Sequence, residues 1–241
     1  HYAHALGALY TSGFDDPLII TADGQGDGLS NSVSTIESAT GKVKRHSSSK
    51  SYHSIGIVYS MVTQYLGFKP GRHEGKITGL AAYGNEVNIK FPITYDSKNN
   101  SFKTELVSSY ILRSNILSFL YFLLFSPKKL LIALTTRATL SNHLITQKTL
   151  YYIAKNFAKI SKEDVAYWVQ SNTEKLLEKY TLNNLEIFNK KDLCVSGGLF
   201  ANVKLNQKLY DIPNLNNLFV MPNMGDGGLT YGAALYIANN Y

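Results

Sequence analysis

The segment that follows residues 18–22 combines carboxylates and glycines in a spacing that suits phosphate or metal binding. The apolar run Leu18–Ala22 predicts a β-strand, which ends in Asp23-Gly24-Gln25-Gly26-Asp27-Gly28. Glycine permits positive φ and lets backbone N–H groups approach an anion. Asp23 and Asp27 could hold a metal or accept the proton of a hydroxyl group. An ordinary Asp-Gly hairpin turn uses the same residue types, so the segment alone supports both interpretations.

Two further predicted strands end in glycine-bearing turns that run into helices. Asp192–Val195 leads into Ser196-Gly197-Gly198, with Asn202 close behind, and Leu218–Met221 precedes Gly225-Asp226-Gly227. The first turn suits a nucleotide, because free N–H groups and the helix dipole favour an anion; tight packing of strand on helix is the alternative. The aspartate of the second turn suits either a metal ligand or a helix N-cap. Ligands bind where strand ends meet at one edge of an open α/β sheet, so the three turns together indicate a phosphate-binding site.

Two polar pairs add candidate functional residues. His1 and His4 are three residues apart, so on a helix they would share a face and could bind one metal ion. The alternative is two exposed histidines at a frayed terminus. Glu74 and Lys76 flank a glycine just before a short helix, where they would contact a nucleotide or form an exposed ion pair. Cys194 lies within an apolar strand, which is typical of an inert core position.

Composition restricts the class of protein and the setting. The 241 residues are 44% hydrophobic and 17% charged, which is typical of a globular chain. The net charge of +7 suits an anionic substrate, whereas the scattered basic residues make nucleic acid an unexpected partner. A single cysteine excludes a disulfide framework and favours a reducing, cytoplasmic setting. No signal-peptide pattern is present, and the start at His1 rather than Met makes a fragment the expectation.

The remaining pattern predicts helices. Apolar residues from Val58 to Leu66 recur at helical spacing, and Gly67 would cap that helix. Ser161-Lys162-Glu163-Asp164 resembles a capping box, and it begins a long helix whose apolar stripe reaches Tyr180.

A separate segment in the middle of the chain lacks glycine turns. Residues 91–111 look irregular, and residues 101–160 are predicted to form an insertion that is mainly helical from residue 112. The longest apolar run, Ile116–Phe125, is about half of a membrane span. It therefore predicts a buried helix, or a helix that docks on a partner or membrane surface, rather than a membrane-spanning one.

Taken in order, these segments resemble the O-carbamoyltransferases of the nodulation-factor and aminoglycoside type. The resemblance covers most of the chain outside residues 91–160. Each matching segment is short and unspecific by itself, but the order and spacing of the segments together are specific. The matching segments are His1-Tyr-Ala-His4-Ala-Leu, Thr21-Ala-Asp23-Gly-Gln-Gly26-Asp27-Gly28, Ser54-Ile-Gly56-Ile-Val-Tyr59, Leu66-Gly67-Phe68, Glu74-Gly-Lys76-Ile-Thr-Gly79-Leu80-Ala81-Ala82-Tyr83-Gly84, Asp164-Val-Ala166-Tyr-Trp-Val-Gln170, Cys194-Val-Ser196-Gly-Gly198-Leu-Phe-Ala-Asn202-Val and Pro222-Asn-Met-Gly-Asp226-Gly-Gly228-Leu-Thr-Tyr-Gly232-Ala-Ala.

The resemblance implies an α/β fold of the actin-like, sugar-kinase-like ATPase type (ribonuclease H-like), with a mixed sheet flanked by helices. Residues 1–241 would form part of the Kae-like ATPase domain, with the helical insertion at 101–160. In such enzymes carbamoyl phosphate and ATP give carbamoyl adenylate, and the carbamoyl group passes to a hydroxyl of a small-molecule or sugar acceptor. A divalent metal, usually iron, is held by histidines and an aspartate, which here look like His4, with His1 beside it, and Asp226.

The resemblance also implies roles for the glycine-bearing turns. The turns at Asp23–Gly28 and Ser196–Gly198 would grip the nucleotide from two sides, and Asp23 or Asp27 would orient the acceptor hydroxyl or take its proton. The expected nucleotide contacts are Gly24, Gly26, Glu74, Lys76, Ser196, Gly197, Gly198 and Asn202.

The chain departs from the family pattern at both ends. The family motif reads His-His-x-x-His with ligands four apart, so His1 matches its second histidine and the first ligand would precede this chain. The N-terminal phosphate-binding hairpin and the C-terminal YrdC-like domain are absent, so we expect a fragment that is inactive alone. Two other functions stay open. One is a tRNA threonylcarbamoyl transferase-like enzyme, although that family usually has Ser-Gly-Gly-His-Thr in place of the Asp23–Asp27 turn; the other is a non-catalytic nucleotide-binding module.

Overall fold

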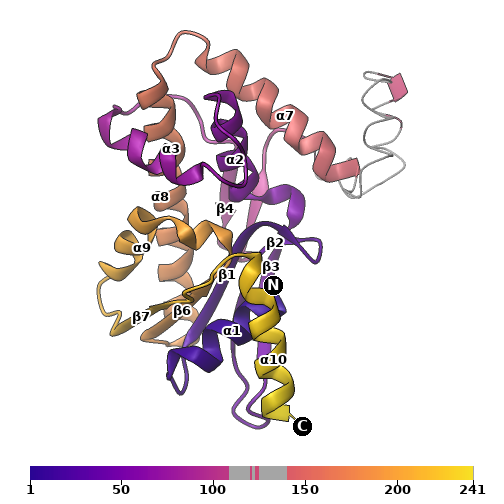
Figure 1. Cartoon of the computed structure of the whole chain (residues 1–241), viewed down its shortest axis with the longest axis vertical. Coiled ribbons are helices and arrows are strands. Elements are labelled where there is room, and N and C mark those ends of the chain that lie inside the picture. The colour runs from indigo at the N-terminus through magenta and orange to yellow at the C-terminus, as the bar shows by residue number, and fades with distance from the viewer. Residues whose placement is uncertain (109–119, 121–122, 125–139, 241) are drawn as a thin grey trace.

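The computed structural model of the chain describes residues 1–108, 120, 123–124 and 140–240 (Figure 1). Within this part of the chain, one mixed sheet has the strand order β3-β2-β1-β6-β7. Its strands are β1 (Leu18–Gly26), β2 (Leu29–Ile36), β3 (Val43–Lys50), β6 (Asp192–Ser196) and β7 (Asn217–Val220). The first three pair antiparallel, whereas β6 runs parallel to both β1 and β7. The carboxyl ends of β1, β6 and β7 therefore meet at one edge, as the three glycine-bearing turns predict.

Helices cover both faces of this sheet. On one face lie α1 (Tyr2–Ser12) and α10 (Leu229–Asn240), which pack against each other and, through α1, against Ile19 and Cys194. On the other face, Leu18 and Ile20 belong to a larger core that includes residues of α2 (Ile55–Tyr65), α3 (Glu74–Leu80), α8 (Lys162–Phe188) and α9 (Val203–Tyr210). Leu18, Ile19 and Ile20 are all fully buried, because alternate side chains of β1 enter opposite cores. The expected α/β class, a mixed sheet flanked by helices, is confirmed.

Both helices predicted from apolar spacing are present, but α2 begins at Ile55 rather than near Val58, and α8 continues past Tyr180 to Phe188. The Ser54 hydroxyl accepts a hydrogen bond from the Ile57 N–H at the start of α2, and Gly67 follows its end with φ of 86°. The Ser161 hydroxyl likewise accepts from the Asp164 N–H at the start of α8. Short 3₁₀ turns complete the set: η1 (Ser51–His53), η2 (Ala81–Tyr83), η3 (Gly198–Ala201) and η4 (Asp226–Gly228).

The expectation of irregular structure over residues 91–111 is wrong. Strands β4 (Ile93–Asp96) and β5 (Ser101–Thr104) form a separate antiparallel hairpin. Phe102 of β5 is buried, and its ring centroid lies 4.8 Å from that of Tyr180 on α8. The polar stretch between the strands is the turn of this hairpin, so the first residues of the proposed 101–160 helical insertion are a strand.

The helical character of the later part of the insertion is confirmed where the structure describes it. Helix α7 (Leu140–Phe157) packs against α2 (Figure 1). The helix predicted from the apolar run Ile116–Phe125 lies outside the described residues, apart from residues 120, 123 and 124. Among the helices that are described, none is long and apolar enough to cross a membrane.

Candidate functional site

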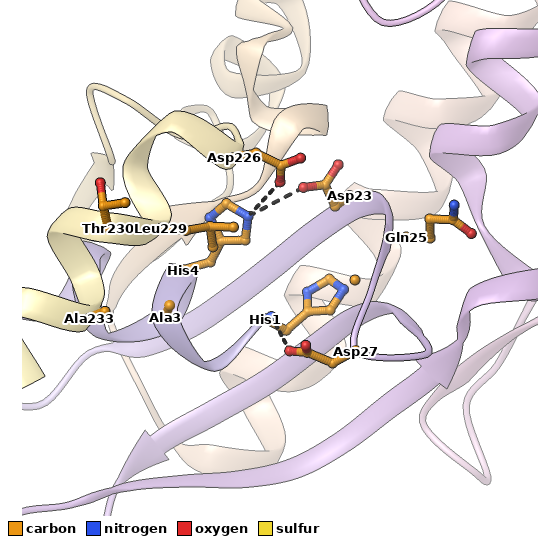
Figure 2. Close-up of a pocket in the computed structure, with 11 residues that line it drawn as sticks. His1, Ala3, His4, Asp23, Gln25, Asp27, Asp226, Leu229, Thr230 and Ala233 are labelled. Atoms are coloured by element: carbon orange, nitrogen blue, oxygen red, sulfur yellow. Dashed lines mark hydrogen bonds and ion pairs between the residues drawn. The ribbon is translucent and has the colours of Figure 1, made fainter. Parts of the chain in front are cut away.

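Three acidic or imidazole side chains from three elements converge at the carboxyl edge of the sheet. His4 lies on α1, Asp23 near the end of β1, and Asp226 at the start of η4, after β7. Nε2 of His4 is 3.3 Å from Oδ2 of Asp23 and 3.8 Å from Oδ1 of Asp226 (Figure 2). One ligand atom of each residue lies within 4.8 Å of the others, so the three side chains could hold a metal ion. We call this group the His4–Asp23–Asp226 cluster.

Burial differs sharply across the cluster. The side chain of His4 is 4% exposed and that of Asp23 is 21% exposed, whereas that of Asp226 is 86% exposed. Burial raises the pKa of Asp23, but hydrogen bonds from His4 and from the backbone N–H groups of Gly24 and Gly198 outweigh it. The pKa of this carboxyl therefore lies below its ordinary value, and Asp23 carries a negative charge at neutral pH.

The residues fit a divalent transition metal. One imidazole nitrogen and two carboxylate oxygens form a donor set that iron, zinc and related ions accept. The other ring nitrogen of His4, Nδ1, lies 3.2 Å from the Ser196 hydroxyl. A metal-binding histidine usually makes such a hydrogen bond through its second nitrogen.

His1 lies near the cluster but outside it. Its ring centroid is 6.4 Å from that of His4, as expected for positions i and i+3 of one helix start. Nδ1 of His1 is bound instead to the Thr21 hydroxyl at 2.8 Å, and that hydroxyl also contacts Ser32. The structure therefore does not bring the imidazole of His1, an expected metal ligand, together with His4 and Asp226.

Two cavities adjoin the cluster and share Asp23, Gln25 and Asp226 in their walls. The larger cavity has a volume of about 710 Å³ and extends from the cluster to α2, α3 and η3. The smaller cavity, of about 400 Å³, lies between the β1–β2 turn and the start of α10. Both volumes are within the range of ligand sites.

Asp27 and Gly26 line the smaller cavity rather than the larger one. The Asp27 carboxylate is 67% exposed, and it accepts a 2.8 Å hydrogen bond from the backbone nitrogen of His1. Asp27 itself has φ of 54°, so this turn adopts the left-handed conformation that Asp-Gly sequences tolerate. Of the two expected acceptor-binding carboxylates, only Asp23 belongs to the cluster.

The glycines after β6 have two different roles. A Cβ on Gly197 would lie 2.2 Å from the carbonyl oxygen of Ala22, and Gly197 has φ of 108°. Gly197 therefore allows the turn after β6 to pack closely on β1, which is the alternative to a nucleotide contact that the sequence leaves open. Gly198 faces the larger cavity, where a Cβ would lie 3.1 Å from Oδ1 of Asp23. Ser196 is buried and, like Gly197, is not among the residues that line either cavity.

Several of the expected nucleotide contacts do line the larger cavity. Gly24, Glu74, Gly198 and Asn202 are among them. The Glu74 carboxylate is held by the Gly71 N–H at 2.6 Å and by the Ser60 hydroxyl at 3.1 Å. It is therefore fixed in place facing a potential ligand.

The basic residue at this cavity is not the one that the sequence suggests. Lys76 is exposed, its ammonium lies 5.5 Å from the ring centroid of Phe68, and it is not among the residues that line the cavity. Arg72 lines the larger cavity instead, and it is the one Lys or Arg among the described lining residues. The sequence signal that points to Arg72 is its place directly after Gly71, in the loop that precedes Glu74.

A buried polar network supports the floor of the larger cavity. Gln170 of α8 accepts hydrogen bonds from the Tyr59 hydroxyl at 2.7 Å and from the Asn202 amide at 2.8 Å. The Asn202 side chain also accepts from the Leu205 N–H and so caps α9. Asn202 therefore combines a cap with a place in the cavity wall.

Comparison with known proteins identifies the family. The sequence profile described as "Carbamoyltransferase N-terminus" matches residues 1–235, so this chain belongs to that carbamoyltransferase family. The family expected from the sequence motifs is thereby confirmed.

Individual relatives are similar over nearly the whole of this chain. The chain is 31% identical over 237 residues to the uncharacterized protein MJ1051 of Methanocaldococcus jannaschii, covering 98% of this chain and 39% of that protein. It is 28% identical over 244 residues to the nodulation protein NolNO of Sinorhizobium fredii, covering 99% of this chain and 30% of that protein. The chain thus spans well under half the length of these relatives.

A solved structure supports the fold. The crystal structure of T. kodakarensis HypF is similar with a TM-score of 0.53 at 12% identity, covering 99% of this chain and 36% of that one. At this identity the likeness concerns the fold alone.

Proposed function

We propose that this chain forms the carbamoyl-transfer site of a longer O-carbamoyltransferase. The full-length protein would transfer a carbamoyl group from carbamoyl adenylate, made from carbamoyl phosphate and ATP, to a hydroxyl of a small-molecule or sugar acceptor. The observation that carries the proposal is the His4–Asp23–Asp226 cluster in the wall between two cavities. Family membership over residues 1–235 supports the same chemistry.

In this proposal the larger cavity binds the nucleotide part of the donor. The Glu74 carboxylate, already held by Gly71 and Ser60, suits the hydroxyls of a ribose. Arg72 supplies positive charge at the cavity wall. The backbone at Gly198 allows close approach to the donor next to the cluster.

A divalent metal would be held by Nε2 of His4 and by the carboxylates of Asp23 and Asp226. When bound, such an ion supplies Lewis-acid stabilisation of developing negative charge on an oxygen. The chain's own residues would set up the reaction: His4 and Asp23 stay fixed in a buried wall, while exposed Asp226 faces incoming ligands.

The acceptor hydroxyl would approach from the smaller cavity. Asp27 lines this cavity with an exposed carboxylate, so it is positioned to orient the hydroxyl or accept its proton. Asp23 would then act within the cluster rather than as the proton acceptor. This division follows from where the two carboxylates lie, since Asp27 is outside the metal-binding distances.

Carbamoyl transfer in the full-length protein tests the proposal. The protein is incubated with ATP, carbamoyl phosphate and a panel of hydroxyl acceptors, and AMP release and carbamoylated product are measured. We expect acceptor-dependent AMP release, with loss of metal and of transfer in Asp226→Ala. Unchanged metal content and transfer in that variant would overturn the metal role. ATP binding without transfer to any acceptor would support a non-catalytic nucleotide-binding module, and transfer to tRNA would support the threonylcarbamoyl-like alternative.

A further inference from the structure

Ser196 occupies a buried position at the end of β6, directly against the His4–Asp23–Asp226 cluster. Its side chain is 1% exposed. The hydroxyl oxygen lies 3.2 Å from Nδ1 of His4 and 3.4 Å from the carbonyl oxygen of Met224. One hydroxyl therefore contacts both α1 and the segment that leads to Asp226.

The two contacts of the Ser196 hydroxyl are compatible with a tautomer of His4 that leaves Nε2 free for a metal ion. A carbonyl oxygen can only accept, so the hydroxyl donates where it bonds Met224. The direction of the 3.2 Å contact with Nδ1 of His4 depends on the histidine tautomer, and the serine oxygen accepts when Nδ1 carries the proton. In that tautomer Nε2 of His4 presents its lone pair toward the carboxylates of the cluster, whereas without a metal ion a proton on Nε2 makes the hydrogen bond to Asp23.

This arrangement directs three electron-pair donors at one point. Nε2 of His4 faces the carboxylates of Asp23 at 3.3 Å and Asp226 at 3.8 Å. Three such groups repel one another unless a cation lies among them, either a proton on Nε2 or a metal ion. The Ser196 oxygen can accept from Nδ1–H, so its contact accommodates the histidine tautomer that a metal ion on Nε2 needs.

The bond to Met224 extends this control to the second carboxylate. The Met224 carbonyl also accepts the Gly197 N–H at 2.7 Å, so two consecutive residues, Ser196 and Gly197, bond to this loop. Met224 lies two positions before Asp226, whose side chain is otherwise 86% exposed. Position 196 therefore links the element bearing His4 with the loop bearing Asp226.

We propose that Ser196 is a positioning residue of the metal centre, fixing the tautomer of His4 and the placement of the Asp226 loop. This replaces the nucleotide contact that its Ser-Gly-Gly context predicts. The proposal rests on the metal-binding part of the proposed function. The ligand whose binding Ser196 would support is a divalent transition metal. Nucleotide contact at this turn is then assigned to Gly198, which lines the larger cavity.

Metal affinity of the full-length protein provides the test. Co²⁺ or Zn²⁺ is titrated against a competing chelator in wild type, Ser196→Ala and Ser34→Ala. Ser34 is an equally buried serine on β2 and provides a matched control, because it has no contact with the cluster among the described residues. We expect Ser196→Ala to bind metal about 10–100-fold more weakly, Ser34→Ala to match wild type, and Ser196→Thr, which keeps the hydroxyl, to retain most of the affinity.

A second measurement uses only the wild-type protein, so it does not depend on whether a Ser196 variant folds. In the Zn²⁺-loaded wild-type protein, ¹⁵N chemical shifts of His4 are expected to show a protonated Nδ1 and a metal-bound Nε2. A metal-bound or unprotonated Nδ1 would overturn the proposal. So would unchanged metal affinity in Ser196→Ala together with weaker binding of a non-hydrolysable ATP analogue measured without metal.

The outcomes separate this proposal from the proposed function. A wild-type protein that binds metal through His4 and loses it in Ser196→Ala, but transfers no carbamoyl group, would support the role of Ser196 and contradict the enzymatic assignment. A wild-type protein that binds no divalent metal would overturn the Ser196 role together with the metal site.

Discussion

Nε2 of His4 lies 3.3 Å from Oδ2 of Asp23, although one residue belongs to α1 and the other to β1. This contact joins a buried imidazole to a carboxylate whose pKa is held below its ordinary value. It places Asp23 within the group of side chains that could hold a metal ion, rather than beside that group as a free base.

Replacing Asp23 by Asn should therefore have its main effect on metal affinity. The amide keeps the shape of the carboxylate but removes its charge, so we expect a loss of affinity of about tenfold or more for Co²⁺ or Zn²⁺. Chelator competition measures this directly. The control Asp211→Asn changes an exposed carboxylate at the end of α9 and should leave metal affinity unchanged. Equal affinities in the two variants would remove Asp23 from the metal site.

A methyl group at position 197 should destabilise the fold. The Cβ of Gly197→Ala would lie 2.2 Å from the carbonyl oxygen of Ala22, in a backbone conformation with φ of 108°. Overpacking of this kind costs about 1–3 kcal/mol, equivalent to a drop in Tm of about 2–12 °C in a domain of this size. Gly79→Ala, at a helical position with open space around it, should be neutral or stabilising. Thermal unfolding of both variants tests the difference, and equal Tm values would contradict the close approach of β6 to β1.

Arg72, rather than Lys76, should influence nucleotide affinity. Arg72 lines the larger cavity, whereas the ammonium of Lys76 lies over the ring of Phe68. Because an exposed charge contact contributes up to about 1 kcal/mol, Arg72→Gln should weaken binding of an ATP analogue up to about fivefold. Lys76→Gln should have no effect, and isothermal titration calorimetry distinguishes the two. A larger effect at Lys76 would restore the nucleotide contact that the sequence suggests.

Cys194 should be chemically silent in the native protein. It is fully buried in the core between the sheet and α1, and burial raises the pKa of its thiol to about 12. Native protein at pH 8 should therefore react with a thiol reagent only as fast as it unfolds. The folded state keeps a proton that the unfolded state loses above about pH 8.5, so Cys194 lowers stability as pH rises from there toward 12. Rapid labelling that is independent of added denaturant would show that the strand β6 is accessible.

The sequence predicts the parts of this site that depend on local patterns. Apolar strands that end in glycine turns place Asp23, Gly198 and Asp226 at one sheet edge, and helical spacing places His1 and His4 on neighbouring positions. Capping residues likewise define α2 and α8. These features follow from residue types within a few positions of one another.

What the sequence does not reveal depends on contacts between distant segments. The proposed role of Ser196 requires His4 and Met224 to meet at one hydroxyl, and Arg72 lines a cavity whose other walls come from distant segments. The β4–β5 hairpin has strands of only four residues, and it is stabilised by packing of Phe102 on Tyr180 rather than by its own periodicity.

The contact between α1 and α10 has a consequence for how the protein is made. A Cβ at Gly232 would lie 2.0 Å from the carbonyl oxygen of Ala3, so the two helices touch through their backbones beside His4 and Asp226. Helix α1 leaves the ribosome early, whereas α10 is synthesised only after every strand of the main sheet. The His4–Asp23–Asp226 cluster can therefore form only after residue 226 has been synthesised, and the helix contact that packs beside it only after Gly232.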